Sequence, residues 1–331
     1  MKAMLMSAPG DPDVFELGEV PTPTPGQSEL LVRLRAAGIN PLDTKVRKMH
    51  MFFPNNLPAI LGCDGAGIVE AVGPGVTRFA KGDEVYFFNN GLGAEPGSCA
   101  EYEVVHEDFA ARKPHSLTMT EAAAVPLVLI TAWEALQRAG LRSGETILIH
   151  AGAGGVGHVA VQLASNLGAR VAATVSGSEK AELVKTLGAE VAIDYKTTDF
   201  VQQTLEWTGG KGADVVLDTV GGATFAKSFG AVRLYGRLAT LLSTTCEMPD
   251  VNKARMRNIT VVYVQMTTPL LLGEREFRRA QTAILEEGAR LFDQGRLKVS
   301  VSEVLRLEDL AAAHRLVEGG HTTGKVVVEI A

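Results

Sequence analysis

The sequence is poor in the features that mark several large classes of protein. Its 331 residues include only three cysteines, at 63, 99 and 246, and so few, so widely spaced, suit a reducing compartment rather than a disulfide framework. No block of lysine or arginine occurs, and the formal net charge is −6, which argues against a nucleic-acid partner. The longest apolar run, 122–133, contains Pro126 and is too short to cross a bilayer. We therefore expect a cytoplasmic protein with neither a nucleic-acid nor a membrane partner.

The pattern of strand-like and helical segments changes near residue 120. Before it, short strand-like segments are separated by glycine and proline, which is typical of a small antiparallel barrel. After it, strand-like and helical segments alternate, which predicts a doubly wound parallel sheet in an α/β fold. The strand-like segment 324–330 would return to the barrel, so we place one domain at 1–122, completed by 269–331, and the other at 123–268. The strands expected in the second domain span 146–150, 170–176, 190–194, 213–218, 237–242 and 259–264, and the helices span 156–167, 179–187, 200–208 and 224–232.

A glycine-rich turn follows the first strand of that second domain. Residues 152–157 read Gly-Ala-Gly-Gly-Val-Gly and lead into a helical segment, the context that a dinucleotide-binding fingerprint requires. Gly152 would make the turn, Gly154 would let the backbone approach a pyrophosphate, and Gly157 would let helix and strand pack closely. A glycine-rich loop between packed elements is the alternative, but the context favours a nicotinamide nucleotide.

The end of the second strand bears on the choice between the two nicotinamide cofactors. An NAD-binding protein would place Asp or Glu near position 176, whereas this chain has Ser176, followed by Ser178 and Lys180. Hydroxyls and an ammonium would bind a 2′-phosphate that a carboxylate would repel. Glu179 weakens the case, and Ser178 could instead cap a helix. We predict NADPH rather than NADH.

Short blocks along the whole chain carry a family resemblance. They include Ala-Gly-Ile-Asn-Pro-Leu-Asp-Thr at 37–44, Leu-Gly-Cys-Asp-Gly-Ala-Gly-Ile-Val at 61–69, Gly-Asp-Glu-Val-Tyr at 82–86, Asp-Val-Val-Leu-Asp-Thr-Val-Gly-Gly at 214–222 and Gly-Lys-Val-Val at 324–327. In this order and spacing the chain resembles the medium-chain dehydrogenase/reductase superfamily, and within it the zinc-independent quinone oxidoreductases. The resemblance implies a GroES-like catalytic barrel, a Rossmann domain and assembly as a homodimer or homotetramer.

The resemblance also bears on metal binding. It places the three zinc-ligand positions of the related alcohol dehydrogenases at Asn40, at Cys63 and near Leu127. A zinc site needs about three ligands drawn from Cys, His, Asp or Glu, and only Cys63 qualifies. We therefore expect no metal, and a relative of the zinc-type alcohol dehydrogenases is the alternative.

The reaction expected of the protein follows from the catalytic groups that the sequence lacks. Without a metal nothing activates an alcohol strongly, and none of the five tyrosines has a lysine four residues on. What remains is hydride transfer from the cofactor to an electrophilic acceptor, such as a quinone or an α,β-unsaturated carbonyl. The resemblance implies that Asn40 lies beside the nicotinamide, where it could hydrogen-bond the substrate carbonyl, and that Asp43 organises the same loop.

One departure from the family pattern concerns the proton donor. Many members carry a tyrosine near the expected lip of the pocket, 48–53, where this chain has Met51 with His50 beside it. His50 could donate a proton instead, although a lone histidine on a loop is more often a solvated side chain.

Further cofactor contacts are implied by position in the family. The pyrophosphate would meet Gly154, Gly155, Val156 and Gly157; the 2′-phosphate would meet Ser176, Gly177 and Lys180; Tyr195 would flank the adenosine ribose; and the nicotinamide half would be bordered by Thr131, Leu241, Leu242, Ser243, Tyr263, Val264 and Gln265.

Alternative functions stay open at this level. An enoyl-thioester reductase would need a basic entrance for coenzyme A, for which Lys45, Arg47 and Lys48 are candidates. A further alternative is a protein that binds NADPH without catalysing a reaction. The intact glycine-rich turn disfavours a purely structural protein. The outermost nucleotide-domain strand, 259–264, is β-branched and apolar, so two copies could pair along it, unless the segment 266–273 covers that edge.

Overall fold

The structure is a computed structural model that describes residues 1–49, 56–242 and 246–331. It divides the chain into two compact units, one formed by Met1–Leu127 with Thr267–Ala331 and the other by Val128–Met266. The sequence placed these borders after residue 122 and before residue 269. Two residues named as site candidates, His50 and Ser243, lie outside the described residues.

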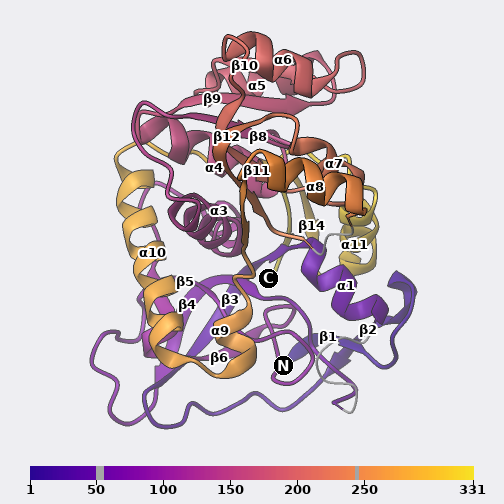
Figure 1. Cartoon of the computed structure of the whole chain (residues 1–331). Coiled ribbons are helices and arrows are strands. Elements are labelled where there is room, and N and C mark those ends of the chain that lie inside the picture. Colours follow the sequence, from indigo (N-terminus) through magenta and orange to yellow (C-terminus); the bar gives the residue numbers. More distant parts are fainter. Residues whose placement is uncertain (50–55, 243–245) are drawn as a thin grey trace. The chain divides into compact units, whose positions relative to one another are not determined.

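The first unit is built on a mainly antiparallel sheet, in which β14 and β15 pair in parallel (Figure 1). Its strand order is β14-β15-β3-β4-β5-β7, with β6 paired to β3, and β1 and β2 form a separate pair. The strands are β1 (Lys2–Met6), β2 (Phe15–Glu19), β3 (Glu29–Ile39), β4 (Asp64–Val72), β5 (Glu84–Phe88), β6 (Tyr102–His106), β7 (Ala110–Arg112), β14 (Val301–Arg306) and β15 (Lys325–Glu329). The helices are α1 (Pro41–Met49), α2 (Met119–Ala123), α9 (Thr268–Leu272), α10 (Arg275–Asp293) and α11 (Leu310–Glu318), with short 3-10 turns at Pro12–Val14, Glu107–Phe109 and Leu307–Asp309.

The C-terminal strand completes this sheet, as the sequence predicts. β15 pairs antiparallel with β3, with Val326 opposite Ile39 and Val328 opposite Ala37. The apolar side chains of β15 are buried, so the return of the chain removes a hydrophobic run from water. It also brings Lys325, the first residue of β15, to the end of β3.

The second unit is a six-stranded parallel sheet with helices between its strands (Figure 1). The order is β10-β9-β8-β11-β12-β13, and it reverses between β8 and β11, which is the point where such sheets bind nucleotides. The strands are β8 (Thr146–Ile149), β9 (Arg170–Val175), β10 (Val191–Asp194), β11 (Ala213–Asp218), β12 (Val232–Thr240) and β13 (Thr260–Tyr263). The helices are α3 (Pro126–Arg138), which starts in the first unit, then α4 (Gly155–Asn166), α5 (Ser178–Thr186), α6 (Phe200–Trp207), α7 (Gly222–Ser228) and α8 (Met248–Met256).

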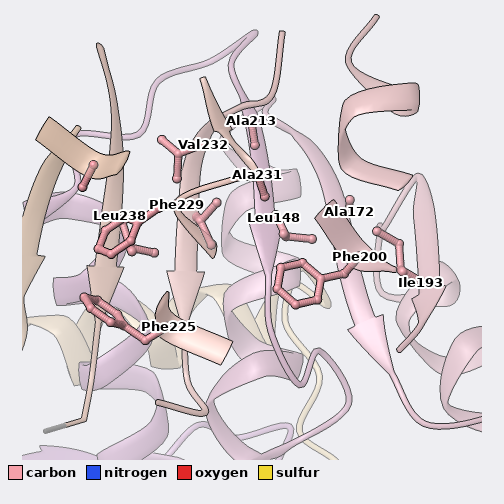
Figure 2. Packing of buried hydrophobic residues seen from close by; sticks show 12 residues of the cluster. Leu148, Ala172, Ile193, Phe200, Ala213, Phe225, Phe229, Ala231, Val232 and Leu238 are labelled. Carbon is pink, nitrogen blue, oxygen red and sulfur yellow. The ribbon is translucent and has the colours of Figure 1, made fainter. Parts of the chain in front are cut away.

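An apolar core forms on one face of the parallel sheet. Figure 2 shows Phe225 and Phe229, from α7 and its C-terminal end, close to Leu238 of β12. The two phenylalanine rings meet edge to face with their centroids 5.1 Å apart, a favoured aromatic geometry. Because a parallel sheet is covered on both faces, its strands are almost wholly apolar, and this is why the sequence marks them clearly.

All six predicted strands and all four predicted helices of this unit are present, with one clear error in length. β12 begins at Val232 rather than at 237, and α7 ends at Ser228. The register explains the difference, because Val232 pairs with Ala213 and Arg237 with Val215, so that residues 233–236 form a bulge. Tyr235 within it adopts a left-handed φ of 56°, and the bulge interrupts the alternation that identifies a strand. The sequence also failed to indicate α3 and α8.

The helices of the structure can be compared with the length and apolar character that a membrane-spanning helix requires. None of the helices in the described ranges is long and apolar enough to cross a membrane.

Candidate active site

The glycine-rich turn joins β8 to α4 in a form that leaves little room for side chains. A Cβ on Gly157 would lie 2.1 Å from the carbonyl oxygen of Ala151, and one on Gly152 would lie 2.6 Å from the Cβ of Ala173. Gly154 is the N-cap residue of α4 and has no side chain to cap it. The first amides of α4 can therefore serve an anion. The backbone of this turn fits a dinucleotide pyrophosphate, and Gly155 and Val156 form the first helical positions.

The buried histidine His150 holds the glycine-rich turn in place, a role that the sequence did not indicate. Nδ1 of His150 lies 3.2 Å from Oγ1 of Thr174, and Nε2 lies 2.9 Å from Oγ of Ser228. Oγ1 of Thr174 also accepts a hydrogen bond from the amide of Ala151 at 3.0 Å. Burial lowers the pKa of His150 to about 4, so the ring is neutral at neutral pH and serves to hold the loop.

The predicted 2′-phosphate contacts follow the end of β9, and the predicted ribose contact, Tyr195, follows the end of β10. Gly177 has a φ of 116° and a Cβ there would meet nothing within 4 Å, so the chain after Ser176 borders open space. Lys180 lies in the first turn of α5. The amide of Tyr195 donates to the carbonyl of Val175 at 3.2 Å, which sets this exposed tyrosine beside the end of β9. The N-cap of α5 is Gly177, so the alternative role of Ser178 as the N-cap is wrong.

The remaining cofactor candidates follow the carboxyl ends of the other strands. Leu241 and Leu242 follow β12, while Tyr263, the last residue of β13, precedes Val264 and Gln265. Asp218, at the end of β11, orders this edge: its Oδ1 accepts from the amides of Val220 and Gly221, and its Oδ2 accepts from Oγ1 of Thr240. Thr131 is buried on α3. Except for Thr131, the described candidates gather where a doubly wound sheet binds its ligand.

The catalytic candidates of the first unit form a buried polar cluster. Asn40 connects β3 to α1, and its backbone amide donates to Oδ2 of Asp43 at 2.8 Å. Its side-chain Nδ2 donates to Oδ2 of Asp64 at 3.0 Å, and its Oδ1 accepts from Nζ of Lys325. Asn40, Asp43 and Asp64 are all fully buried. The side-chain amide of Asn40 is thus hydrogen-bonded through both of its polar atoms.

The ionisable groups of this cluster are strongly perturbed. Burial, aided by the carboxylate of Asp64, raises the pKa of Asp43 to about 7. Burial also raises the pKa of Asp64 and lowers the pKa of Lys325, while their ion pair, 3.5 Å between Oδ2 and Nζ, opposes both shifts. The cluster thus combines several charges in a dry environment, a pattern common at functional sites.

The segment after Asn40 is a helix, where a loop was expected. Asp43 accepts a hydrogen bond at the start of α1, and its carboxylate suits the positive end of the helix. The same helix buries Arg47, whose guanidinium contacts the carbonyl of Gly10, Nδ1 of His314 and Glu318, and Lys48 pairs with Glu318 at 3.5 Å. Two of the three basic residues proposed for a coenzyme A entrance are thus already paired. The expected lip reaches residues 50–53, which lie outside the described residues.

The residues at the zinc-ligand positions do not fit a zinc ion. Asn40 offers an amide that is already hydrogen-bonded, and Leu127 has no donor atom in its side chain. The thiol of Cys63 lies 3.7 Å from Oδ1 of Asp43, and burial together with Asp43 and Asp64 raises its pKa, which disfavours the thiolate that binds metal. Within the described residues, no group of three or more His, Cys, Asp or Glu is placed to hold a metal ion.

Comparison with known proteins extends over the whole chain. Residues 26–115 match the alcohol dehydrogenase GroES-like domain and residues 187–328 match the zinc-binding dehydrogenase family. A quinone oxidoreductase of Pseudomonas aeruginosa is 36% identical over 328 residues, 99% of each chain. A 2-haloacrylate reductase of a Burkholderia species is 33% identical over 335 residues, 98% of each. The solved structure of a mycobacterial protein complexed with NADPH has a TM-score of 0.86 at 31% identity, covering 99% of this chain and 100% of that one.

Fold, site and matches together define an oxidoreductase with a nicotinamide cofactor, built from a GroES-like barrel and a Rossmann sheet. The chain belongs to the medium-chain dehydrogenase/reductase superfamily, in its quinone oxidoreductase branch. The fold class and the family predicted from the sequence are confirmed.

Proposed function

We propose that the protein is an NADPH-dependent reductase that transfers hydride to a quinone or an α,β-unsaturated carbonyl without a metal. The observation that carries this proposal is the chemistry at the three zinc-ligand positions. They hold a hydrogen-bonded amide, a buried thiol and a leucine, so an unactivated alcohol would find no Lewis acid there. The acceptor must then be electrophilic by itself.

The choice of NADPH rests on the end of β9. Ser176, Gly177 and Lys180 offer a hydroxyl, an open backbone and an ammonium where an NAD-selective site would have a carboxylate. Tyr195 lies at the neighbouring strand end and could cover the ribose. When bound, the cofactor supplies the hydride, while the glycine-rich turn holds its pyrophosphate and the two strand ends hold its adenosine half.

The substrate end of the site is proposed around Asn40 and Asp43. Because Nδ2 and Oδ1 of Asn40 are bonded to Asp64 and Lys325, we assign Asn40 the role of shaping the site through its fixed amide. Direct contact with a substrate carbonyl would require it to give up one of those bonds. Asp43 holds the start of α1, and His50 stays a predicted proton donor outside the described residues.

Assembly and location complete the proposal. β13 is the last strand in the order of the described parallel sheet, so two copies could pair there to form a homodimer, which could in turn be part of a homotetramer. The three cysteines are free, which suits the cytoplasm that we propose as its compartment.

The proposal is tested by the oxidation of NADPH in the presence of candidate acceptors. The purified protein is dialysed against a chelator and assayed with benzoquinones, naphthoquinones, 2-chloroacrylate, short enals and an enoyl thioester, each with NADPH and with NADH. We expect turnover with a quinone or an enone, a preference for NADPH and no loss on chelation. Turnover with simple alcohols that requires added zinc would contradict the proposal, and turnover with the thioester alone would favour the coenzyme A alternative.

A further inference from the structure

Lys325 reaches the catalytic cluster from the far end of the chain. It lies 285 residues after Asn40, as the first residue of β15, and its side chain is only 3% exposed. Burying an ammonium is costly unless it is paired and hydrogen-bonded. The contacts of the ammonium therefore show both how its burial is made possible and which segments it holds.

The ammonium is surrounded by acceptors. Nζ donates to Oδ1 of Asn40, to the carbonyl oxygen of Ile39 at 3.1 Å and to Oδ2 of Asp64 at 3.5 Å. Three acceptors use the three protons of a charged lysine. Two of these hydrogen bonds, to Ile39 and Asn40, hold the junction where β3 ends and α1 begins.

Asp64, the carboxylate partner of Lys325, connects the ion pair to a second segment of the chain. Oδ1 of Asp64 accepts from the backbone amide of Leu127 at 2.8 Å, in the first turn of α3, where a negative charge stabilises the helix. Its Oδ2 binds both Lys325 and Nδ2 of Asn40. The ion pair thereby ties together the end of β3, the start of β4 and the start of α3.

By the family resemblance, these segments carry or adjoin the three positions of zinc ligands in the zinc-dependent alcohol dehydrogenases. Asn40 and Leu127 stand at two of the zinc-ligand positions, and Asp64 follows the third, Cys63. In this chain Lys325 provides a positive charge beside Asn40, and Asp64 connects it to the backbone of Leu127. A covalently attached cation with hydrogen-bond donors thus makes connections that ligand bonds to zinc would otherwise make.

We propose that Lys325 is a positioning residue for the reduction, acting with Asp64 as an internal substitute for a metal ion that fixes Asn40 and the start of α3. This inference rests on the proposed function, since α3 also carries Thr131, four residues after Leu127, which we place beside the nicotinamide. Lys325 touches neither substrate nor cofactor in this role. It acts through the segments that it holds.

The test separates positioning from mere stabilisation. Lys325→Met leaves Asp64 buried without its cation, and we expect its thermal midpoint to fall. The double variant Lys325→Met/Asp64→Asn removes both charges. An amide at 64 can still accept from the amide of Leu127, and its NH2 can donate to Oδ1 of Asn40, which loses Lys325, once the Asn40 side chain turns over. We expect the double variant to regain most of the midpoint, yet to lose about 10- to 100-fold in kcat, because small displacements of site residues cost that much. Its KM for NADPH should change little.

A matched control uses an exposed pair of the same kind in the same unit. Lys81 and Glu70 pair at 2.6 Å between Nζ and Oε1 on the surface. Lys81→Met/Glu70→Gln should leave kcat and the thermal midpoint near those of the unmodified protein, because exposed pairs contribute little.

A second readout does not depend on turnover. The fluorescence of bound NADPH reports the nicotinamide environment, whereas the affinity for 2′,5′-ADP reports the adenosine half alone. We expect the double variant to change the fluorescence while binding 2′,5′-ADP with unchanged affinity. If the unmodified protein reduced no acceptor, the proposed function would fail, but this fluorescence difference would still support positioning. Unmodified kcat and fluorescence in the double variant, or an equal loss of 2′,5′-ADP binding, would overturn it.

Discussion

Nε2 of His150, after β8, lies 2.9 Å from Oγ of Ser228 on α7, and this contact fixes the tautomer of the imidazole. Oγ of Ser228 gives its only proton to the carbonyl of Thr224 at 2.6 Å, so it must accept from His150. Nδ1 is then an acceptor for the hydroxyl of Thr174, whose oxygen accepts from the amide of Ala151. A chain of hydrogen bonds, each group donating to the next, runs from the glycine-rich turn to α7.

Breaking this chain at Thr174 should weaken cofactor binding. Thr174→Val keeps the volume but leaves the amide of Ala151 without its acceptor, at a cost of about 1–3 kcal/mol for an unsatisfied buried group. We expect a lower thermal midpoint and a several-fold higher Kd for NADPH, measured by fluorescence titration. Thr186→Val, at an exposed threonine on α5, is the control. A lowered midpoint with an unchanged Kd would mean that the chain supports the fold but not the turn.

Cofactor preference should depend on the end of β9. Ser176→Asp places a carboxylate where it repels a 2′-phosphate and accepts from ribose hydroxyls, so the ratio of kcat/KM for NADPH to that for NADH should fall well below its value in the unmodified protein. Lys180→Ala should lower kcat/KM for NADPH and leave that for NADH unchanged. Lys185→Ala, further along α5 and paired with Glu182, should leave the ratio unaltered. Equal or better use of NADH by the unmodified protein would refute the assignment.

Metal independence is open to direct measurement. Elemental analysis of protein purified without added metal should find well below one zinc per chain, because the residues at Asn40, Cys63 and Leu127 supply at most one ordinary ligand. Activity should survive prolonged chelation. Zinc at one per chain that is lost together with activity would contradict this expectation.

The buried carboxyl of Glu103 should make the stability depend on pH. Its Oε1 accepts from Nδ2 of Asn89 at 2.9 Å, and its buried Oε2 has no hydrogen-bond partner among the described residues. Burial raises the pKa of Glu103 to about 8, so the folded state holds a proton that the unfolded chain releases near 4.5. This contribution is complete below 4.5 and is lost as the pH rises through about 8. The free energy of unfolding should fall by on the order of 1 kcal/mol per pH unit in that window.

Glu103→Gln isolates this effect. The neutral amide should flatten the fall in stability and make the variant more stable than the unmodified protein near pH 8. Denaturant unfolding between about pH 6.5 and 8 is the cleanest measurement, since the buried His150, whose pKa is lowered from 6.5 to about 4, is neutral in the folded state there and loses its remaining charge in the unfolded chain as the pH rises. The raised pKa of Asp43 leaves a residual slope. Glu276→Gln, at an exposed position, should leave the curve unchanged. A Glu103→Gln variant whose curve matched that of the unmodified protein would contradict the argument.

The sequence predicted the nucleotide domain well because its signals are local. A buried parallel strand followed by a glycine-rich turn occupies a single stretch of chain, and each candidate contact follows its own strand. The cluster around Asn40 was predicted only in part. Its two decisive partners, Asp64 and Lys325, lie 24 and 285 residues away, and no local pattern pairs a particular lysine with a particular amide. The histidine chain was missed for the same reason, since His150 and Ser228 are 78 residues apart.

Other failures came from elements with weak patterns. The helix α1 follows Asn40-Pro41 and is short and largely polar, so it read as a loop. The helix α8 is equally short and has most of its residues exposed, so it lacks the apolar stripe that identifies a surface helix. For α1, tertiary contacts, such as those of the buried Arg47 with α11, decide the structure more than local preference does.

The edge of the parallel sheet provides the last prediction, which concerns assembly. The amide of Val264 donates to the carbonyl of Thr240 on β12. Because the backbone amides along a strand point alternately to its two edges, the amide of Val262 also faces β12, whereas those of Val261 and Tyr263 face away from it. The side chain of Tyr263 is 63% exposed. An edge with outward-facing amides and β-branched residues invites antiparallel pairing with a second copy.

Light scattering at micromolar concentration should therefore report about twice the chain mass or a multiple of it. Val261→Pro removes one outward donor and should lower that mass while leaving the thermal unfolding of the monomer cooperative. Val262→Pro should instead disrupt the pairing of β13 with β12 and lower the thermal midpoint, so the two variants separate loss of the interface from loss of the strand. A monomeric mass for the unmodified protein would rule out pairing through this edge, because the outward amides of β13 would then be met by water.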